Sequence, residues 1–313
     1  MDISDQLNVT PVEEVEPFLE LTPALVQKRR SQGRIIFDRF IRNRAAILGA
    51  LVLALLFLFC FLGPLVWRID ADAINVTNVS STLAGPSLQH PFGTDDVGRD
   101  EMARVMAGGR VSLLIGLSSM FVAIFFGVGI GAFAGFYGGI VDNLLMRFTD
   151  VALAVPLYLL LFVLSASFTD HTAKSVIILI AILTWTYAAR LVRGEFLSLK
   201  EREFVLSART IGARNFRLMA RHILPSAAGP IIVNATLLVG ANIILESVMS
   251  YFGFGIQPPA SSWGNLVSIG QGFFDVAPWL VLTPGLLIFL TVLSFNLAGD
   301  GLRDAVDPYM TER

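Results

Sequence analysis

Six apolar stretches, each long enough to cross a bilayer as a helix, dominate the pattern of this chain. A hydrocarbon core about 30 Å thick needs roughly 20 apolar residues of helix. The stretches are continuously apolar rather than alternating, which favours helices over a membrane barrel. We therefore expect an all-α integral membrane protein with six transmembrane helices. The predicted spans are Ala45–Trp67, Val111–Tyr137, Val151–Phe168, Ser175–Val192, Ala227–Phe252 and Trp279–Gly299.

Polar segments between these spans predict the organisation of the chain. The stretch Arg34–Arg44 mixes isoleucine and phenylalanine with arginine, which is typical of a basic helix lying at a membrane surface. The apolar run after Arg44 is long enough to span, so we expect an anchor rather than a cleaved signal. The predicted order is a cytoplasmic tail at 1–44, the first span at 45–67, an external segment at 68–110, a five-helix core at 111–300 containing a loop at 197–225, and a cytoplasmic tail at 301–313.

Composition supports the membrane assignment. The chain is 54% hydrophobic and only 15% charged, and its mean hydropathy is +0.68. These values exclude an ordinary soluble domain of this length. The net charge of −2 is too small to indicate a nucleic-acid partner.

Lysine and arginine are distributed unevenly between the two sides of the predicted spans. The segments on one side contain only Arg68, Arg99, Arg104, Arg110 and Lys174. The remaining 18 of the 23 basic residues fall on the side that contains both ends of the chain. Positive charge accumulates on the cytoplasmic side of membrane proteins. Both termini are therefore expected in the cytoplasm of a multi-pass protein.

Residues for enzymatic chemistry are absent from the sequence. It contains no phosphate-binding G-x-x-x-x-G-K-[ST] loop, so we expect no ATP site of this type, no catalytic residue and no bound cofactor. The histidines, at 90, 171 and 222, lack the spacing of metal ligands, so no metal site is expected. The single cysteine, Cys60, lies among apolar residues and is expected to be a packing residue.

A basic segment between the fourth and fifth spans interrupts the apolar pattern. Residues 201–225 predict two short helices separated at Gly212, the second of which ends at Pro225. Phe204, Ala208 and Ile211 are expected on one face of the first helix, and Phe216, Met219 and Ala220 on one face of the second. A basic amphipathic pair of this kind suits either a lipid surface or a docking site for another protein, and the pattern alone does not choose.

The sequences S-A-R-T-I-G and R-H-I-L-P in this segment resemble the EAA loop of bacterial ABC importer permeases. In that family the loop is the helix that couples the permease to its ATPase. Leu206 stands where the motif has glutamate, Ser207 replaces an alanine, and His222 replaces an isoleucine. Glu203 is the candidate to replace the motif glutamate. The resemblance places Glu203, Leu206, Ser207, Ala208, Arg209, Gly212, His222, Leu224 and Pro225 in the coupling loop.

Three further stretches narrow the resemblance to the C-type permease subunit of oligopeptide, dipeptide and nickel ABC importers. They are H-P-F-G-T-D-D-V-G-R-D from His90, S-Y-F-G-F-G-I-Q-P-P from Ser250, and F-N-L-A-G-D-G-L-R-D-A-V-D-P from Phe295. Individual residues in them are expected to have structural roles. These are Asp95 or Asp96 as a helix N-cap, Gly253 and Gly255 as a helix stop, and Asp307-Pro308 as a turn.

Polar residues in the fifth span form one helical face. Asn234, Asn242, Glu246 and Ser250 are spaced by eight, four and four residues. Polar groups at membrane depth tend to face a protein interior or a water path, so this face either lines the translocation pathway or forms interhelical hydrogen bonds. In the second span, small residues predict close helix packing. They are Gly116, Gly127, Gly129, Gly131 and Gly135.

The resemblance implies an ABC type I importer permease that moves peptides or similar small solutes by alternating access. It also implies a second, B-type permease subunit, two cytoplasmic ABC ATPase subunits that bind ATP, and an extracytoplasmic substrate-binding protein. The expected location is a bacterial inner or plasma membrane. A stand-alone secondary transporter or channel, and a membrane scaffold that recruits a partner through the basic loop, are the alternatives. Neither explains why the loop and the other motifs occur together.

Overall fold

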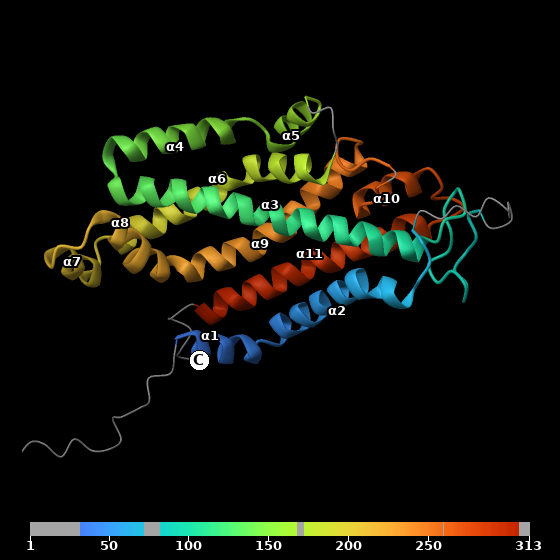
Figure 1. Cartoon of the computed structure of the whole chain (residues 1–313), viewed down its shortest axis with the longest axis horizontal. Coiled ribbons are helices and arrows are strands. Elements are labelled where there is room, and N and C mark those ends of the chain that lie inside the picture. Colours follow the sequence, from blue (N-terminus) through green and yellow to red (C-terminus); the bar gives the residue numbers. More distant parts are fainter. Residues whose placement is uncertain (1–31, 72–81, 168–171, 259, 307–313) are drawn as a thin grey trace, which may run out of the picture.

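A computed structural model describes residues 32–71, 82–167, 172–258 and 260–306, and these residues are almost entirely helical (Figure 1). The elements are α1 (Gln32–Arg42), α2 (Arg44–Val66), α3 (Glu101–Tyr137), α4 (Gly139–Ala154), α5 (Leu157–Ser165), α6 (Ala173–Leu199), α7 (Glu203–Thr210), α8 (Asn215–Arg217), the π-helix η3 (Leu218–Ile223), α9 (Leu224–Tyr251), α10 (Trp263–Gln271) and α11 (Trp279–Val306). The expected turn at 307–308, His171 and the tail before Gln32 lie outside the described residues.

The helices confirm an all-α membrane protein. Five helices of the described chain are long and apolar enough to span a bilayer, and a sixth span is present if α4 and α5 are counted as one. α3 begins ten residues before the span predicted from Val111, because the polar residues from Glu101 continue the same helix. α6 likewise continues past Val192 to Leu199. Arg193 therefore lies within a helix rather than in a loop.

The third span is not the straight helix predicted from Val151 to Phe168. α4 and α5 meet at an angle of 83°. Pro156 has no N–H to continue the helix, and Val155 before it adopts the extended backbone (φ −89°, ψ 133°) that a following proline favours. The hydropathy of this region indicated a span but carried no information on its bend.

α3 is the central helix, and its glycines let α6 approach closely. A Cβ atom on Gly127 would lie 2.5 Å from the Ala188 Cβ atom, and one on Gly135 would lie 2.6 Å from the Phe196 Cβ atom. The prediction of close packing is therefore confirmed for these glycines. It is wrong for Gly129, whose Cβ position has open space around it.

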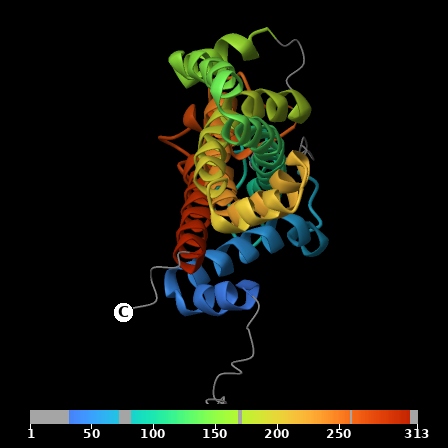
Figure 2. The same cartoon turned by 90° about the vertical axis from the view of Figure 1, so that its left-hand side faces the viewer.

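The remaining helices cover two opposite sides of the central group. α2 packs along α11, where Gly49 brings the two backbones together at Ser294. Figure 1 shows α4 and α5 at one edge of the molecule and α1, α2 and α11 at the other, and Figure 2 shows the same separation from the side. We call the end of the bundle that carries α7 the α7 end, and the opposite end, which carries α10, the α10 end.

α9 does not begin after a helix that Pro225 terminates, as the sequence pattern predicted. α8, η3 and α9 form one continuous helical run, Asn215–Tyr251. In η3 the Leu224 N–H bonds to the Met219 carbonyl, five residues back. This wider register accommodates Pro225, which lacks an N–H and whose ring crowds the preceding turn. The second half of the basic loop is thus continuous with the fifth span.

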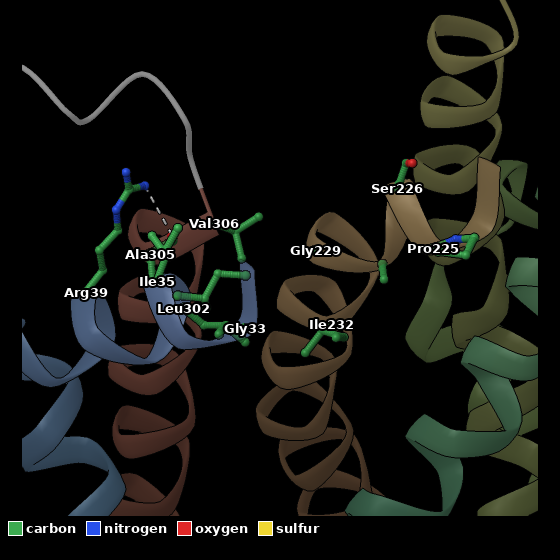
Figure 3. Close-up of a pocket in the computed structure, with 12 residues that line it drawn as sticks. Gly33, Ile35, Arg39, Pro225, Ser226, Gly229, Ile232, Leu302, Ala305 and Val306 are labelled. Carbon is green, nitrogen blue, oxygen red and sulfur yellow. Dashed lines mark hydrogen bonds between the residues drawn. The ribbon is translucent and has the colours of Figure 1, made fainter. Parts of the chain in front are cut away.

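The short helix α1 lies beside the final turns of α11 at the α7 end. Arg39 Nη1 donates a hydrogen bond of 3.5 Å to the Ala305 carbonyl (Figure 3). A groove of about 580 Å³ separates α1 and the end of α11 from the start of α9. Its lining is apolar apart from Arg39 and Ser226. α1 also exposes Phe37 and Ile41.

Candidate functional site

The basic loop contains a defined stop at Gly212. Gly212 has φ +87°, a left-handed conformation that glycine adopts without strain. Its N–H bonds to the Arg209 carbonyl at 3.0 Å, and the Ala213 N–H bonds to the Ala208 carbonyl at 3.1 Å. These two bonds form a Schellman motif, which ends α7 and turns the chain toward α8.

α7 is attached to the bundle by two buried side chains. Val205 and Ala208 belong to an apolar cluster with Phe196 of α6 and with Leu218 and Ile223 of η3. The predicted apolar face of α7 is therefore only partly right. Ala208 is buried, but Phe204 and Ile211 point away from the bundle.

The outer surface of the loop is apolar and basic. Ile211 is 87% exposed and Phe216 is 77% exposed, which is unusual for side chains of this size. A cavity of about 300 Å³ adjoins Ile211 between the end of α7 and η3. Arg217, Arg221 and His222 line this cavity together with residues 208 and 211–213. The arrangement suits a partner with an apolar pocket and acidic groups around it.

The other predicted loop residues occupy both halves of this structure. Glu203 lies in the first turn of α7, and Leu206, Ser207 and Arg209 lie on its exposed side. His222 lies in η3, and Leu224 and Pro225 begin α9. The motif thus runs from an exposed helix into the base of a membrane span.

The predicted polar face of α9 is mostly buried inside the chain. Glu246 is fully buried and accepts hydrogen bonds from Ser112 Oγ at 2.8 Å and Ser250 Oγ at 2.7 Å. Ser112 Oγ accepts in turn from the Trp263 N–H at 3.2 Å, and Ser250 Oγ accepts from the Ile256 N–H at 3.0 Å. Glu246 therefore joins α3 to α9 directly and to α10 through Ser112, which favours the interhelical role of the two alternatives.

Asn242 and Asn234 do not extend this network. Asn242 is fully buried, and its Nδ2 donates to Ser119 Oγ of α3 at 2.9 Å. Asn234 is half-buried two turns closer to the α7 end, and its Oδ1 atom has no partner. The four residues share a helical face, but the structure does not bring them to one open cavity.

Asp100, rather than Asp95 or Asp96, is the N-cap of α3. Its Oδ1 atom accepts from the Ala103 N–H at 2.7 Å and from Trp67 Nε1 at 3.1 Å. Its Oδ2 atom lies 2.8 Å from His90 Nδ1. Asp95 instead holds the preceding turn. The N-cap lies four or five residues after the two predicted cap positions because Gly98, with φ +80°, continues that turn.

Asp95 forms a buried ion-pair network at the α10 end. Its Oδ2 atom accepts from Arg99 Nε and Arg104 Nη1, each at 2.6 Å. Arg104 Nη2 also donates a hydrogen bond of 3.4 Å to Ser261 Oγ, in the loop that precedes α10. At the end of α9, Gly253 has φ +81° and the Phe254 N–H bonds to the Met249 carbonyl, so Gly253 is the helix stop that the sequence predicted.

Two ion pairs between α4 and α6 were not predicted. Arg193 donates two hydrogen bonds to the Asp142 carboxylate, at 2.5 and 2.7 Å. Arg190 Nη2 donates to Asp150 Oδ1 at 2.7 Å. The charge count placed both arginines with the basic residues of the cytoplasmic side, although Arg190 falls within the predicted span Ser175–Val192. Asp142 and Asp150 lie in one apolar segment, and Arg190 and Arg193 lie in the next. These opposite charges were the sequence feature from which the two ion pairs could have been predicted.

Comparisons with known proteins agree with this geometry. The family described as "Binding-protein-dependent transport system inner membrane component" matches residues 127–312. The "N-terminal TM domain of oligopeptide transport permease C" matches residues 31–91. The chain belongs to this permease family.

Relatives of the permease align over nearly its whole length. The dipeptide transport system permease protein DppC of Alkalihalophilus pseudofirmus is 40% identical over 280 residues, covering 90% of this chain and 91% of the relative. The oligopeptide transport system permease protein OppC of Escherichia coli K12 is 38% identical over 288 residues, covering 90% and 94%. These values confirm the resemblance to C-type permeases.

A solved structure shows that the permease has the fold of ABC type I importers. Inward-facing MetNI, a methionine ABC transporter, aligns with a TM-score of 0.54 and 18% identity. The alignment covers 66% of this permease and 97% of the MetNI chain. Among the described residues, no group of three or more His, Cys, Asp and Glu side chains could hold a metal ion.

Proposed function

We propose that this permease is one of two transmembrane subunits of an ATP-driven importer that moves peptides across a bacterial inner or plasma membrane. The relatives named above are peptide permeases, which supports this solute class. The chain itself supplies the pore and binds no cofactor. Two separate ATPase subunits bind and hydrolyse ATP.

The exposed apolar surface of the α7 loop is the single observation that carries this proposal. Ile211 and Phe216 are among the most exposed large apolar residues of the described chain. Ile211 directly follows α7 and Phe216 lies in α8, so the two side chains flank the Gly212 stop, and the buried Val205 attaches α7 to the bundle. This rigid apolar projection, with arginines around it, fits a pocket on a soluble ATPase. A lipid surface would not require Ile211 to be held at a fixed helix end, so it explains the arrangement less well.

The packing of α7 also connects it mechanically to two membrane-spanning helices. Val205 and Ala208 contact η3, and η3 is continuous with α9. The same cluster contains Phe196 near the end of α6. A displacement of α7 by an ATPase would thus move α6 and α9 together. We infer that closure of the ATPase pair drives alternating access in this way.

Orientation and the remaining partners follow from the same assignment. The α7 end and both termini face the cytoplasm, which the basic residues of that end support. A second, B-type permease subunit completes the pathway, and a substrate-binding protein delivers peptide at the α10 end. Coupling-loop roles are assigned to Glu203, Ser207 and Arg209 on the exposed side of α7.

The main alternative is a transporter or channel that works without an ATPase. Co-purification distinguishes the two, with Ile211→Asp as the test variant and Val276→Asp as the control. Val276 is also exposed, at 64%, but lies at the α10 end. We expect Ile211→Asp to reduce recovery of the ATPase subunits at least tenfold and Val276→Asp to leave recovery unchanged. Peptide uptake by vesicles that contain the permease subunits but no ATPase would instead establish the alternative.

A further inference from the structure

A polar stripe runs along the outer side of α4. Asn143, Arg147 and Asp150 are spaced four and three residues apart, so they share one helical face, and all three are exposed. Arg190 of α6, which pairs with Asp150, continues this stripe, and Tyr187 lies one turn farther along the same face of α6. Figure 1 shows α4 at the edge of the molecule, and no other helix of the described chain covers its outer side.

The stripe lies at membrane depth. α6 has 27 residues and is about 40 Å long at 1.5 Å per residue. A hydrocarbon core of about 30 Å takes up roughly 20 residues of helix, and the apolar stretch Ser175–Val192 of α6 includes Arg190. The packing agrees, because Gly127 of the apolar part of α3 lies against Ala188. Arg190 and Asp150 are therefore level with apolar spans, not with a loop.

Exposure at this depth distinguishes the Asp150–Arg190 pair from its neighbour. The side chains of Arg190 and Asp150 are 50% and 52% exposed. Those of Arg193 and Asp142 are 35% and 15% exposed, and two hydrogen bonds join them. The second pair therefore already joins α4 to α6, and the more exposed first pair is available for another role. A half-exposed ion pair beside lipid tails would be strongly unfavourable, whereas a water-filled path solvates both charges.

We propose that the face formed by Asn143, Arg147 and Asp150 of α4 and Tyr187 and Arg190 of α6 lines the translocation path and binds the charged ends of the peptide. The Asp150 carboxylate accepts hydrogen bonds from the peptide α-ammonium group. The Arg190 guanidinium donates to the α-carboxylate, for which its planar donors are well matched. Each contact replaces half of the Asp150–Arg190 pair, so neither charge is left without a partner.

This inference rests on the proposed peptide import, and the first test is independent of the solute. Single cysteines replace adjacent residues of α4 in the assembled importer after Cys60→Ala removes the native thiol. Asn143→Cys and Arg147→Cys should react with a charged, water-soluble thiol reagent. Leu144→Cys and Phe148→Cys, whose native side chains are also exposed, should react at least tenfold more slowly. Equal rates for the two sets, or no reaction at any position, would overturn the aqueous face.

The second test concerns the peptide ends. A free tripeptide, its N-acetylated form and its C-amidated form are each presented to reconstituted importer at equal occupancy of the binding protein. Asp150→Asn should reduce the preference for the free over the acetylated peptide at least fivefold. Arg190→Gln should do the same for the free over the amidated peptide.

Two outcomes and one control variant separate the competing explanations. If uptake of all three peptides falls by one common factor, the pair has only a packing role and the inference is wrong. Asp142→Asn provides that comparison, because loss of the less exposed Asp142–Arg193 pair should lower the yield of assembled complex without changing the preference among peptides. If the wild-type importer moves no peptide but moves another solute, the proposed peptide substrate fails while the cysteine pattern still tests the path.

Discussion

Ser112 of α3 donates a hydrogen bond of 2.8 Å to the Glu246 carboxylate of α9. Both residues are fully buried, and the same hydroxyl oxygen accepts from the Trp263 N–H at the start of α10. The carboxylate therefore joins α3 to α9 directly, and the Ser112 hydroxyl connects this pair to the start of α10. Because the site is closed to bulk solvent, its polar groups depend on one another for hydrogen bonds.

Replacing Glu246 should destabilise the permease. Glu246→Leu leaves the buried hydroxyls of Ser112 and Ser250 without their acceptor, at a cost of about 1–3 kcal/mol for each group. Glu246→Gln keeps one acceptor oxygen and should cost less than half as much. Thermal unfolding of the purified protein in detergent measures both. If the Leu variant unfolds at the wild-type temperature but transports slowly, Glu246 has a pathway role instead of the packing role.

The close contact of α3 with α6 provides a matched pair of variants. A Cβ atom on Gly131 would lie 2.8 Å from the Val192 Cβ atom and 3.0 Å from the Arg193 nitrogen, whereas Gly129 has no atom within 4 Å. We expect Gly131→Leu to destabilise the protein by about 1–3 kcal/mol or prevent assembly, because overpacking forces the helices apart. Gly129→Leu, two residues away, should be tolerated. Equal yields of folded protein from the two variants would show that this contact does not control stability.

Hydropathy and charge allowed much of the fold to be predicted, because a bilayer requires long apolar helices. The bend between α4 and α5 was missed, since a proline within an apolar stretch is compatible with either a kinked or a broken helix. Pro225 was wrongly predicted to end a helix because the π-helical register of η3 depends on its packing. The role of Glu246 stayed open for a similar reason, since its partner Ser112 is 134 residues away in the chain.

The residue that caps an individual helix could not be predicted from the sequence pattern either. Asp95, Asp96 and Asp100 all precede the same helix, and each residue type can cap. The choice of Asp100 depends on Trp67 and His90, which reach its carboxylate from elsewhere in the chain. The turn in the α7 loop was easier to predict, because it occurs at a glycine, Gly212, and because the family motif includes this residue.

Cysteine labelling tests the proposed orientation. Asp275 is exposed at the α10 end, and Asn215 is exposed in the basic loop. With Cys60 replaced, Asp275→Cys should react with an impermeant thiol reagent added to intact cells. Asn215→Cys should react only after the membrane is made permeable. The reverse pattern would place the termini outside and contradict the charge distribution.

The last prediction concerns Gly212, where backbone conformation and partner contact coincide. Its φ of +87° costs other L-residues roughly 1–2 kcal/mol, although asparagine tolerates this region better than most. The Cβ position itself is open within the chain, so a side chain there would meet only a docked partner. Gly212→Asn should therefore preserve the α7 stop and test partner contact, while Gly212→Ala should cost about 1 kcal/mol locally. Gly212→Glu adds a bulky negative charge beside Arg217 and Arg221, and should abolish most peptide-stimulated ATP hydrolysis in reconstituted importer while leaving membrane insertion intact. If the Glu variant retains wild-type stimulation and uptake, the α7 loop has no part in coupling.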